Sequence, residues 1–346
     1  MLFLWMMLFT GPSKITFTPI KTLAPLPEDQ DIYLQNVIHV EVDETGRYYV
    51  SDFPSARIYM WNPDGSYAGF FGGKGEGPGE FVFAAALGPP MGHVYQTGER
   101  TYVYDGANRA VSVFDAERRF VARVTLQGLG GKINAFHVLE RDRFLFYDSY
   151  FCEEKACRRI LEYDGKGNLT KTWSTSPDNT WQHVKATGKV KLFIWEPIPV
   201  VDFSRKRGEV VLAHSQAPML TVYDRKGREK RKVTLDIPRK QVTREDIAEY
   251  NAQPWLKDAN HVVPVFPDQK DYFDRILTLD QGYLLYHLSP FYGRANGYLV
   301  DFDGKLMGRF ELACGEGGGL FAPYGRLMAA LIDEEGDISV HEMKVH

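Results

Sequence analysis

Cysteine is scarce in this sequence, which has only three among its 346 residues. So few cysteines cannot hold together a chain of this length, and the fold must therefore rest on a hydrophobic core, for which a hydrophobic content of 44% is sufficient. No Cys or His pairs repeat at the spacing of zinc ligands, so a structural zinc site is not predicted. Cys152 and Cys157 flank a short polar segment where the pattern predicts a hairpin tip. A disulfide across this tip, which would suit an exported protein, and a pair of surface thiols both remain open.

Long hydrophobic runs are absent as well. The run Leu2–Phe9 is too short to span a bilayer, has no basic residue before it, and is followed by a polar turn. We interpret residues 1–13 as a signal peptide or its remnant, which predicts a periplasmic or secreted protein. The alternative is a buried N-terminal strand. No membrane span is predicted, and no cysteine follows the run to support a lipoprotein anchor.

An excess of charge of either sign is also missing, since the net charge is only -4. Without a basic surface, nucleic acid and anionic membranes are not favoured as partners. No G-x-S-x-G segment frames a nucleophile, and no Lys-Ser or Lys-Thr follows the glycine-rich segments, so neither a serine hydrolase nor a phosphate-binding loop is predicted. Helical periodicity occurs only in Thr243–Tyr250, within a long insertion that spans residues 238–271. The chain is therefore expected to be all-β.

A repeat is what the sequence does contain. An apolar strand ends in Asp or His, and a polar turn and a further strand follow it. The copies are YYVSD ending at Asp52, TYVYD at Asp105, FLFYD at Asp148, VVLAH at His214, YLLYH at His287 and, less clearly, LMAALID at Asp333. They stand roughly 40 to 75 residues apart, which leaves room for four short strands in each unit. Such a period is typical of a repeat architecture built from strands.

The first unit shows its four strands most clearly. Segments of about six residues in the range 36–71 are separated by Gly, Asp and Pro turns, which are hairpin signals. Six such sheets bury both faces when they are arranged radially, so the sequence predicts a six-bladed β-propeller of four-stranded antiparallel blades. Residues 14–346 are expected to form this single domain, with the insertion 238–271 over one face. Lys14–Ile20 is expected to supply the strand that completes the last blade and closes the ring.

Blade six allows two registers. The segment Ile332–Val340 can be aligned with Val42–Val50, which would make its DEEG turn the first turn of the blade and Glu342 the repeated anchor. The other register keeps Asp333 as the anchor. We favour the second register, because Leu320–Tyr324 can supply an inner strand before it.

The segment Val42–Phe81 resembles the repeat of NHL and TolB-like six-bladed propellers. It contains VDETGRYYVSD, RIYMWNPDG and the connection FGGKGEGPGEF, and weaker copies cover nearly all of the remaining chain. This resemblance implies the propeller fold. It implies several functions, because propellers of this group include exported bacterial proteins without known activity, lactonases, lyases and interaction modules.

The repeated anchors are the candidate site. In a propeller they are expected to ring one mouth of the central channel, so Asp52, Asp105, Asp148, His214 and His287 are candidate ligand-binding residues. The last three are candidate ligands of a divalent metal ion. The alternative is structural, because an Asp that ends a strand commonly accepts hydrogen bonds from its own turn. That alternative is favoured for the three Asp residues and is weaker for the two His residues, which break the repeat.

Two functions follow from these residues. The favoured one is an exported, non-catalytic propeller that binds a protein, peptide or glycan at the channel mouth, aided by Trp255 in the insertion. The competing one is a metal-dependent hydrolase or lyase acting on a lactone or ester through the Asp and His residues. The Glu and Asn ligands of gluconolactonase-like propellers cannot be placed here, which argues against the lactonase.

Overall fold

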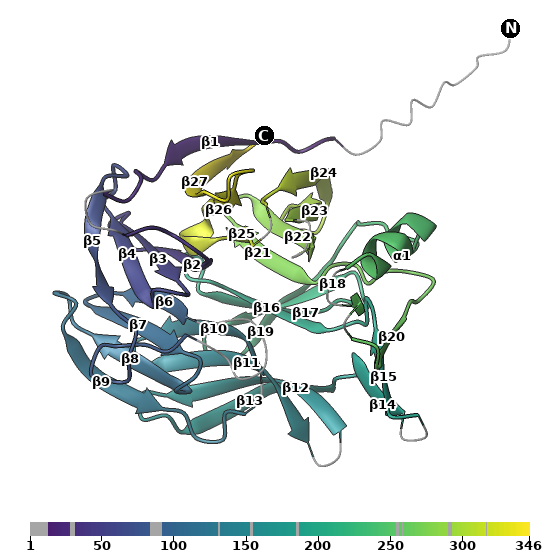
Figure 1. Cartoon of the computed structure of the whole chain (residues 1–346), viewed down its shortest axis with the longest axis horizontal. Coiled ribbons are helices and arrows are strands. Elements are labelled where there is room, and N and C mark those ends of the chain that lie inside the picture. The colour runs from purple at the N-terminus through teal and green to yellow at the C-terminus, as the bar shows by residue number, and fades with distance from the viewer. Residues whose placement is uncertain are drawn as a thin grey trace, which may run out of the picture.

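The computed structural model describes residues 13–27, 32–83, 92–130, 132–152, 155–184, 187–253, 256–257, 259–289, 293–315 and 317–346. Six four-stranded antiparallel sheets are arranged as the blades of a ring, seen along its axis in Figure 1. The predicted all-β, six-bladed β-propeller is therefore confirmed. Among the described residues, no helix combines the length and the apolar character needed to cross a membrane.

In each of the first five blades the chain runs from the inner strand, beside the channel, to the outer strand. Blades one to three consist of β2 (Val37–Val42), β3 (Tyr48–Asp52), β4 (Arg57–Trp61) and β5 (Tyr67–Gly72); β6 (Gly92–Thr97), β7 (Arg100–Asp105), β8 (Ala110–Phe114) and β9 (Phe120–Thr125); and β10 (Lys132–Glu140), β11 (Arg143–Cys152), β12 (Lys155–Asp164) and β13 (Leu169–Pro177). Blades four and five consist of β16 (Pro199–Ser204), β17 (Glu209–His214), β18 (Met219–Asp224) and β19 (Glu229–Thr234); and β21 (Arg275–Leu279), β22 (Gly282–Ser289), β23 (Arg294–Val300) and β24 (Leu306–Ala313).

Blade six joins the two ends of the chain. It consists of β25 (Gly319–Phe321), β26 (Leu327–Ile332), β27 (Ile338–Val345) and, as its outer strand, β1 (Phe17–Thr22). Strand β1 pairs antiparallel with β27, from Phe17 opposite Val345 to Thr22 opposite His341. The expected closure of the ring by an N-terminal strand is confirmed, with the strand three residues later than the predicted start.

The register of blade six is also resolved. Strand β25 pairs with β26 on the channel side, and a short 3-10 turn, η2 (Pro323–Gly325), connects them. The DEEG turn therefore follows the second strand of the blade, as the favoured register predicts, and Glu342 lies within β27. Blade six resembles the other blades in topology although its inner strand is only three residues long.

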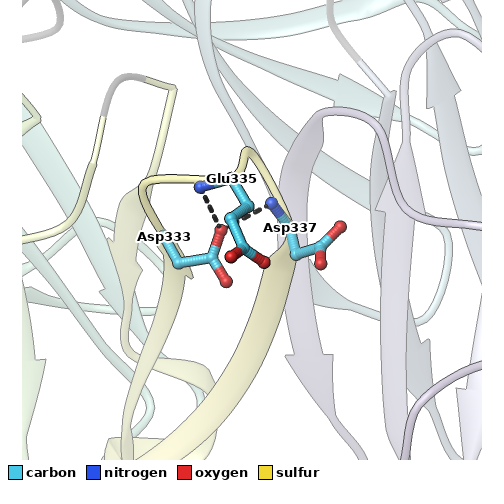
Figure 2. A group of neighbouring side chains, drawn as sticks. All are labelled: Asp333, Glu335 and Asp337. Atoms are coloured by element: carbon cyan, nitrogen blue, oxygen red, sulfur yellow. Dashed lines mark hydrogen bonds between the residues drawn. The ribbon is translucent and has the colours of Figure 1, made fainter.

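Turn chemistry explains why the two registers were hard to separate. The carboxylate of Asp333 accepts hydrogen bonds from the backbone N–H groups of Glu335 and Asp337, at 3.0 and 2.9 Å (Figure 2). The first turn of blade one does the same, because Asp43 accepts from Thr45 and Arg47 at 2.8 and 3.0 Å. The same pattern caps the turns that begin at Asp115, Asp164, Asp224 and Asp301. Equal local chemistry thus recurs at topologically different turns.

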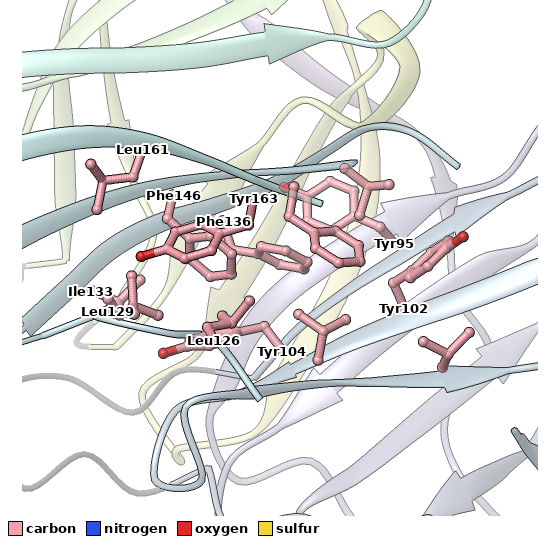
Figure 3. Close-up of a cluster of buried hydrophobic side chains, with 14 residues drawn as sticks. Tyr95, Tyr102, Tyr104, Leu126, Leu129, Ile133, Phe136, Phe146, Leu161 and Tyr163 are labelled. Carbon is pink, nitrogen blue, oxygen red and sulfur yellow. The ribbon is translucent and has the colours of Figure 1, made fainter. Parts of the chain in front are cut away.

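The hydrophobic core lies between neighbouring blades. Figure 3 shows the cluster between blades two and three, where aromatic side chains such as Tyr104, Phe136 and Phe146 pack edge to face or tilted. Comparable clusters fill the other junctions around the ring. Each large side chain buried in this way stabilises the fold by roughly 1.5–3 kcal/mol, which is why the blades pack face to face rather than standing alone.

The insertion that spans residues 238–271 contains the predicted helix. Helix α1 (Arg244–Asn251) begins with a capping box formed by Thr243 and Asp246. Strand β20 (Val262–Val265) of the same insertion pairs in parallel with β15 (Lys189–Phe193), which pairs with β14 (Trp181–Val184). This three-stranded accessory sheet was not predicted, because it joins two segments that are far apart in the sequence.

Two strands run further than the sequence suggests. Strand β11 continues past Asp148 to Cys152, and β22 continues past His287 to Ser289, so these two residues do not end their strands. In the β11–β12 hairpin Cys157 is opposite Tyr150, whereas Cys152 is opposite Lys155. The two cysteines are therefore not cross-strand partners, and Cys157 is buried rather than a surface thiol.

Candidate functional site

The three repeated Asp residues fasten each blade to the chain segment that enters it. Asp52 is fully buried and accepts hydrogen bonds from the backbone N–H groups of Gln35 and Asn36, both at 2.8 Å. Asp105 is equally buried and accepts from the N–H of Val82 and from the Asn108 amide, at 2.9 and 2.8 Å. The turn after the second strand thus lies at the same end of the ring as the connections between blades.

Asp148 shows a variation of this arrangement. Its carboxylate forms an ion pair with Arg159 on the neighbouring strand and has no exposed surface. Burial raises the pKa of Asp148, and the hydrogen bonds and charge of Arg159 oppose that shift. All three Asp side chains are therefore engaged in internal contacts. Their partners are chiefly the entering chain segment or Arg159, whereas the sequence predicted only the backbone of their own turns.

His214 does not take over the role of Asp in blade four. Its side chain is exposed, and the adjacent Ser215 does the fastening instead. The Ser215 hydroxyl accepts a hydrogen bond from the N–H of Ile198 at 2.8 Å, and the Ser215 N–H donates to the Ile198 carbonyl at 2.9 Å. The break in the repeat at His214 is thus a shift of the anchor by one residue.

His287 holds the end of the insertion against blade five. Its Nε2 lies 2.7 Å from the Asp271 carboxylate, and the two side chains are 13% and 3% exposed. The N–H of Tyr272 donates to the Ser215 carbonyl, and Lys240 donates to the Asn296 amide oxygen at 3.0 Å. These contacts lie at the connection end of blades four and five, whereas β20 of the same insertion contacts β15, which precedes blade four. Trp255 lies outside the described residues.

The predicted metal ligands are not gathered in one place. Asp148 is engaged with Arg159 and His287 with Asp271, while His214 is exposed. Within the described part of the chain, only the carboxylates of Asp333, Glu335 and Asp337 lie mutually close enough to share a metal ion (Figure 2). Their geometry is that of the capped turn described above, and all three side chains are exposed.

The central channel contains a cavity of about 420 Å³, which the inner strands of all six blades line. None of Asp52, Asp105, Asp148, His214 and His287 contributes to its wall. Its polar wall residues come mostly from the inner strands and their ends, and also include Tyr147, Arg158 and Tyr286 of the strands behind them. The cavity has three levels with different chemistry: a closed end, a histidine level and an open end.

At the closed end an ion pair crosses the channel. Glu41 of blade one pairs with Arg205 of blade four, which stands opposite in the ring, and the two side chains are 2% and 8% exposed. The ring of Tyr324, from η2, lies 5.7 Å from the Arg205 guanidinium. Burial raises the pKa of Glu41 to about 7, although the Arg205 charge opposes the shift. The channel is therefore sealed at the end opposite the blade connections.

Three histidines occupy the middle level, one from each of blades one to three. The rings of His39 and His93 are 4.7 Å apart, and the Tyr95 hydroxyl lies 3.0 Å from Nδ1 of His137. Burial lowers the pKa of all three, to about 3 for His93 and about 4 for His137, so they are neutral at physiological pH. One nitrogen of each ring lacks a hydrogen-bond partner among the described residues: Nδ1 of His39, Nδ1 of His93 and Nε2 of His137.

Cationic side chains surround the open end, which we call the mouth. Arg158 and Arg275 line the cavity there, on blades three and five, and Lys132 begins the inner strand of blade three. Arg158 donates to the Tyr147 hydroxyl at 2.9 Å and pairs with Asp178 at 3.1 Å. Partial desolvation and the charges of Arg158 and Arg275 lower the pKa of Lys132. The three cations are thus close enough to influence one another.

The sequence contained a signal for the channel residues, but the more regular strand-end Asp and His residues drew attention away from it. His39, His93 and His137 stand on the strand that precedes Asp52, Asp105 and Asp148, where they alternate with apolar residues. Alternation on an innermost strand sends successive side chains to opposite faces of the blade, beside the channel. Polar residues at these positions, rather than strand-end residues, identify the channel wall.

No protein-family model matches this sequence, and no curated protein matches it. Solved structures do match. A member of the DUF4221 family from Bacteroides vulgatus aligns with 97% of this chain and 99% of its own, at 12% identity and a TM-score of 0.53. A protein from Bacteroides fragilis that is inferred to be exported aligns with 96% of this chain and 95% of its own, at 11% identity and a TM-score of 0.55. At such low identities the similarity shows the fold alone, and the fold of this chain is the six-bladed β-propeller.

Proposed function

We propose that this chain is an exported, non-catalytic propeller of the NHL or TolB-like type that binds a peptide, protein segment or glycan at the mouth of its channel. The observation that carries the proposal is the asymmetry of the cavity. The Glu41–Arg205 pair closes one end, whereas the other end opens among charged side chains that belong to different blades. A blind cavity of about 420 Å³ accepts the end of a ligand rather than letting it pass through.

Export is supported by the apolar run Leu2–Phe9 and by the similarity to the Bacteroides fragilis protein that is inferred to be exported. The NHL-like type is supported by the segment 42–81, whose connection to blade two is held in place by Arg123. Its guanidinium donates to the carbonyl groups of Glu76, Gly77 and Glu80.

Filling the cavity tests the proposal directly. Ala135 is a small residue of the channel wall, and Ala135→Phe places a ring in the cavity. A library of short peptides and oligosaccharides is screened by thermal shift against the wild-type protein and this variant, with Val121→Phe on the exposed outer strand as the control. We expect hits that stabilise the wild type and the control but not Ala135→Phe. Hits that stabilise all three proteins equally, or no hits at all, contradict binding in the channel.

A metal-dependent hydrolase or lyase is the second candidate, because three neutral imidazoles with partnerless nitrogens line the channel. No three of these nitrogens lie close enough together to share one ion, so a metal here would need further ligands from the solvent or the substrate. Imidazole is a good ligand of zinc, copper and nickel. Metal analysis of the protein after incubation with these ions, compared with His93→Ala, separates the two functions. Stoichiometric metal that disappears in the variant, together with hydrolysis of a lactone, supports the enzyme. Absence of both supports the binding protein.

A further inference from the structure

The mouth has two cations, Arg275 and Lys132, that form no ion pair among the described residues. Elsewhere in the described chain, several cations share one buried carboxylate: Glu209 pairs with Arg207, Lys230 and Arg231. At the mouth, only Arg158 has a carboxylate partner, Asp178. The Arg275 guanidinium donates to the Asp274 carbonyl at 3.2 Å, and among the described residues neither Arg275 nor Lys132 has a carboxylate within ion-pair distance.

The neighbouring carboxyl groups have other partners or lie beyond ion-pair distance of Arg275 and Lys132. Asp274 is the carboxyl group beside Arg275, but it does not lie within ion-pair distance of the Arg275 guanidinium. Burial raises the pKa of Asp274, and the Arg275 charge opposes that shift. Asp271 is already engaged by His287, and Asp178 by Arg158. Partial desolvation lowers the pKa of His214 on blade four, and the nearby charge of Glu196 opposes that shift. The described mouth thus has at least as many carboxyl groups as cations, and what distinguishes Arg275 and Lys132 is that neither forms an ion pair among the described residues.

The two sides of the mouth face the same opening. Arg158 and Lys132 belong to blade three and Arg275 to blade five, so blade four separates them and the cavity lies between them. An arginine fork presents several N–H donors in one plane and matches the paired oxygens of a carboxylate or phosphate group. Two such cationic sides around one opening hold an oxyanion from two directions.

The residues deeper in the channel determine which chemical groups the rest of the ligand can have. The rings of His39, His93, Tyr95 and Phe321 lie together in the channel, with His39 5.0 Å from Tyr95 and 6.1 Å from Phe321. Because these imidazoles are neutral, they give no charge to attract an anion deeper. At the closed end Arg205 already forms an ion pair with the Glu41 carboxylate, so it is not available to a ligand. A ligand with one charged end therefore keeps that end at the mouth and places a flat or apolar part among the rings.

We propose that the mouth is an oxyanion site, in which Arg275, Lys132 and Arg158 hold a carboxylate or phosphate group of the ligand while its aromatic or apolar part enters the channel. This inference rests on the proposed binding function and adds the chemistry of the group that is recognised. Arg275 and Lys132 are the specificity-determining residues, because both are exposed and neither serves an internal ion pair among the described residues.

Three probes that differ only in the head group test the site. Benzoate, phenyl phosphate and benzamide are titrated by ligand-observed NMR into the full chain and into the variants Arg275→Gln, Lys132→Gln and Arg228→Gln. The last variant removes the same charge from an exposed turn of blade four. Because both mouth side chains are exposed, thermal unfolding should confirm that the folds are unchanged.

We expect the anions to bind better than benzamide, with about tenfold weaker binding or more in Arg275→Gln and Lys132→Gln and no change in Arg228→Gln. Stronger binding of benzoate or of phenyl phosphate tells which oxyanion the site prefers. The inference is overturned if benzamide binds as well as the anions, if the mouth variants bind them as the wild type does, or if neither anion binds. Should neutral peptides or glycans still bind and be blocked by Ala135→Phe, only the oxyanion inference fails, and the proposed function remains.

Discussion

The two ends of the channel are built around the same six inner strands but differ in their ion pairs. Charged side chains are paired at the closed end, whereas two at the mouth are unpaired among the described residues. At the closed end, Glu41 and Arg205 face each other across the ring with almost no exposed surface. At the mouth, Arg275 and Lys132 are exposed and have no such counterpart among the described residues. The repeat fixes the position of each strand, whereas single residues at the strand ends decide whether an end seals or binds. Charge that is matched internally serves the fold, and charge that is left over is available to a ligand.

Removing the cation of the closed end should have the largest effect. Arg205→Ala leaves the Glu41 carboxylate buried without its partner, and we expect the free energy of unfolding at pH 8 to fall by about 3–5 kcal/mol. Urea denaturation measures this loss. The double variant Arg205→Ala with Glu41→Gln, which removes the unpaired charge, should recover part of the stability. If the double variant is no more stable than the single one, the loss comes from packing rather than from charge.

The pH dependence of the closed end should come next. The pKa of Glu41 is about 7 in the folded protein against an ordinary value of 4.5, so the folded state binds the proton more tightly. This contribution to stability is present below pH 4.5 and is lost as the pH rises toward 7, on the order of 3 kcal/mol in total. The unfolding free energy of the wild type should therefore fall relative to that of Glu41→Gln between about pH 4 and pH 8. Parallel curves for the two proteins would refute the assignment.

Arg158 should show an intermediate effect, because it belongs to the mouth but has an internal partner. Arg158→Ala removes the ion pair with Asp178 and the hydrogen bond to Tyr147, whose side chains are largely buried. We expect a loss of about 2 kcal/mol in urea denaturation. Arg158→Lys keeps the positive charge but not the planar guanidinium, and its unfolding free energy should fall by less than that of Arg158→Ala. A loss as large as that of Arg205→Ala would mean that the two ends do not differ as described.

The smallest effect on stability should be that of Arg275. Since its side chain is exposed, Arg275→Gln should change the unfolding free energy by less than about 0.5 kcal/mol. The same variant is expected to weaken the binding of an anionic probe, so stability and binding separate at this residue. A marked destabilisation would assign Arg275 to the fold, as Arg205 is assigned.

Local patterns were sufficient to predict most of the fold. Alternating apolar residues and Gly, Asp or Pro turns located the blades, and Lys14–Ile20 identified the closing strand near its observed place. The accessory sheet escaped prediction because β15 and β20 pair in parallel across a long sequence separation, with Val190 opposite Val262. Short strands that meet through such distant pairing leave no period in the sequence.

The candidate site was harder to predict than the fold. The residues that drew attention, Asp52 and Asp105 among them, repeat because every blade must hold the chain that enters it. The channel residues differ from blade to blade, as Glu41, His137 and Arg275 do, and they become neighbours only when the ring closes. A repeat in the sequence therefore reports the common structural need of the blades, whereas a site depends on the positions where the blades differ.

Strand β1 has a consequence for the order in which the molecule is completed. It is the first described strand to leave the ribosome, and its partner β27 is among the last, since Phe17 lies opposite Val345. At 5–20 residues per second, β1 waits roughly 15 s to 1 min for that partner. During this time the seam is open, and one face of blade one and one face of blade five lack the apolar neighbour that blade six later provides. Closing the seam is thus a late event of biogenesis, and the final sealing and shape of the channel depend on it.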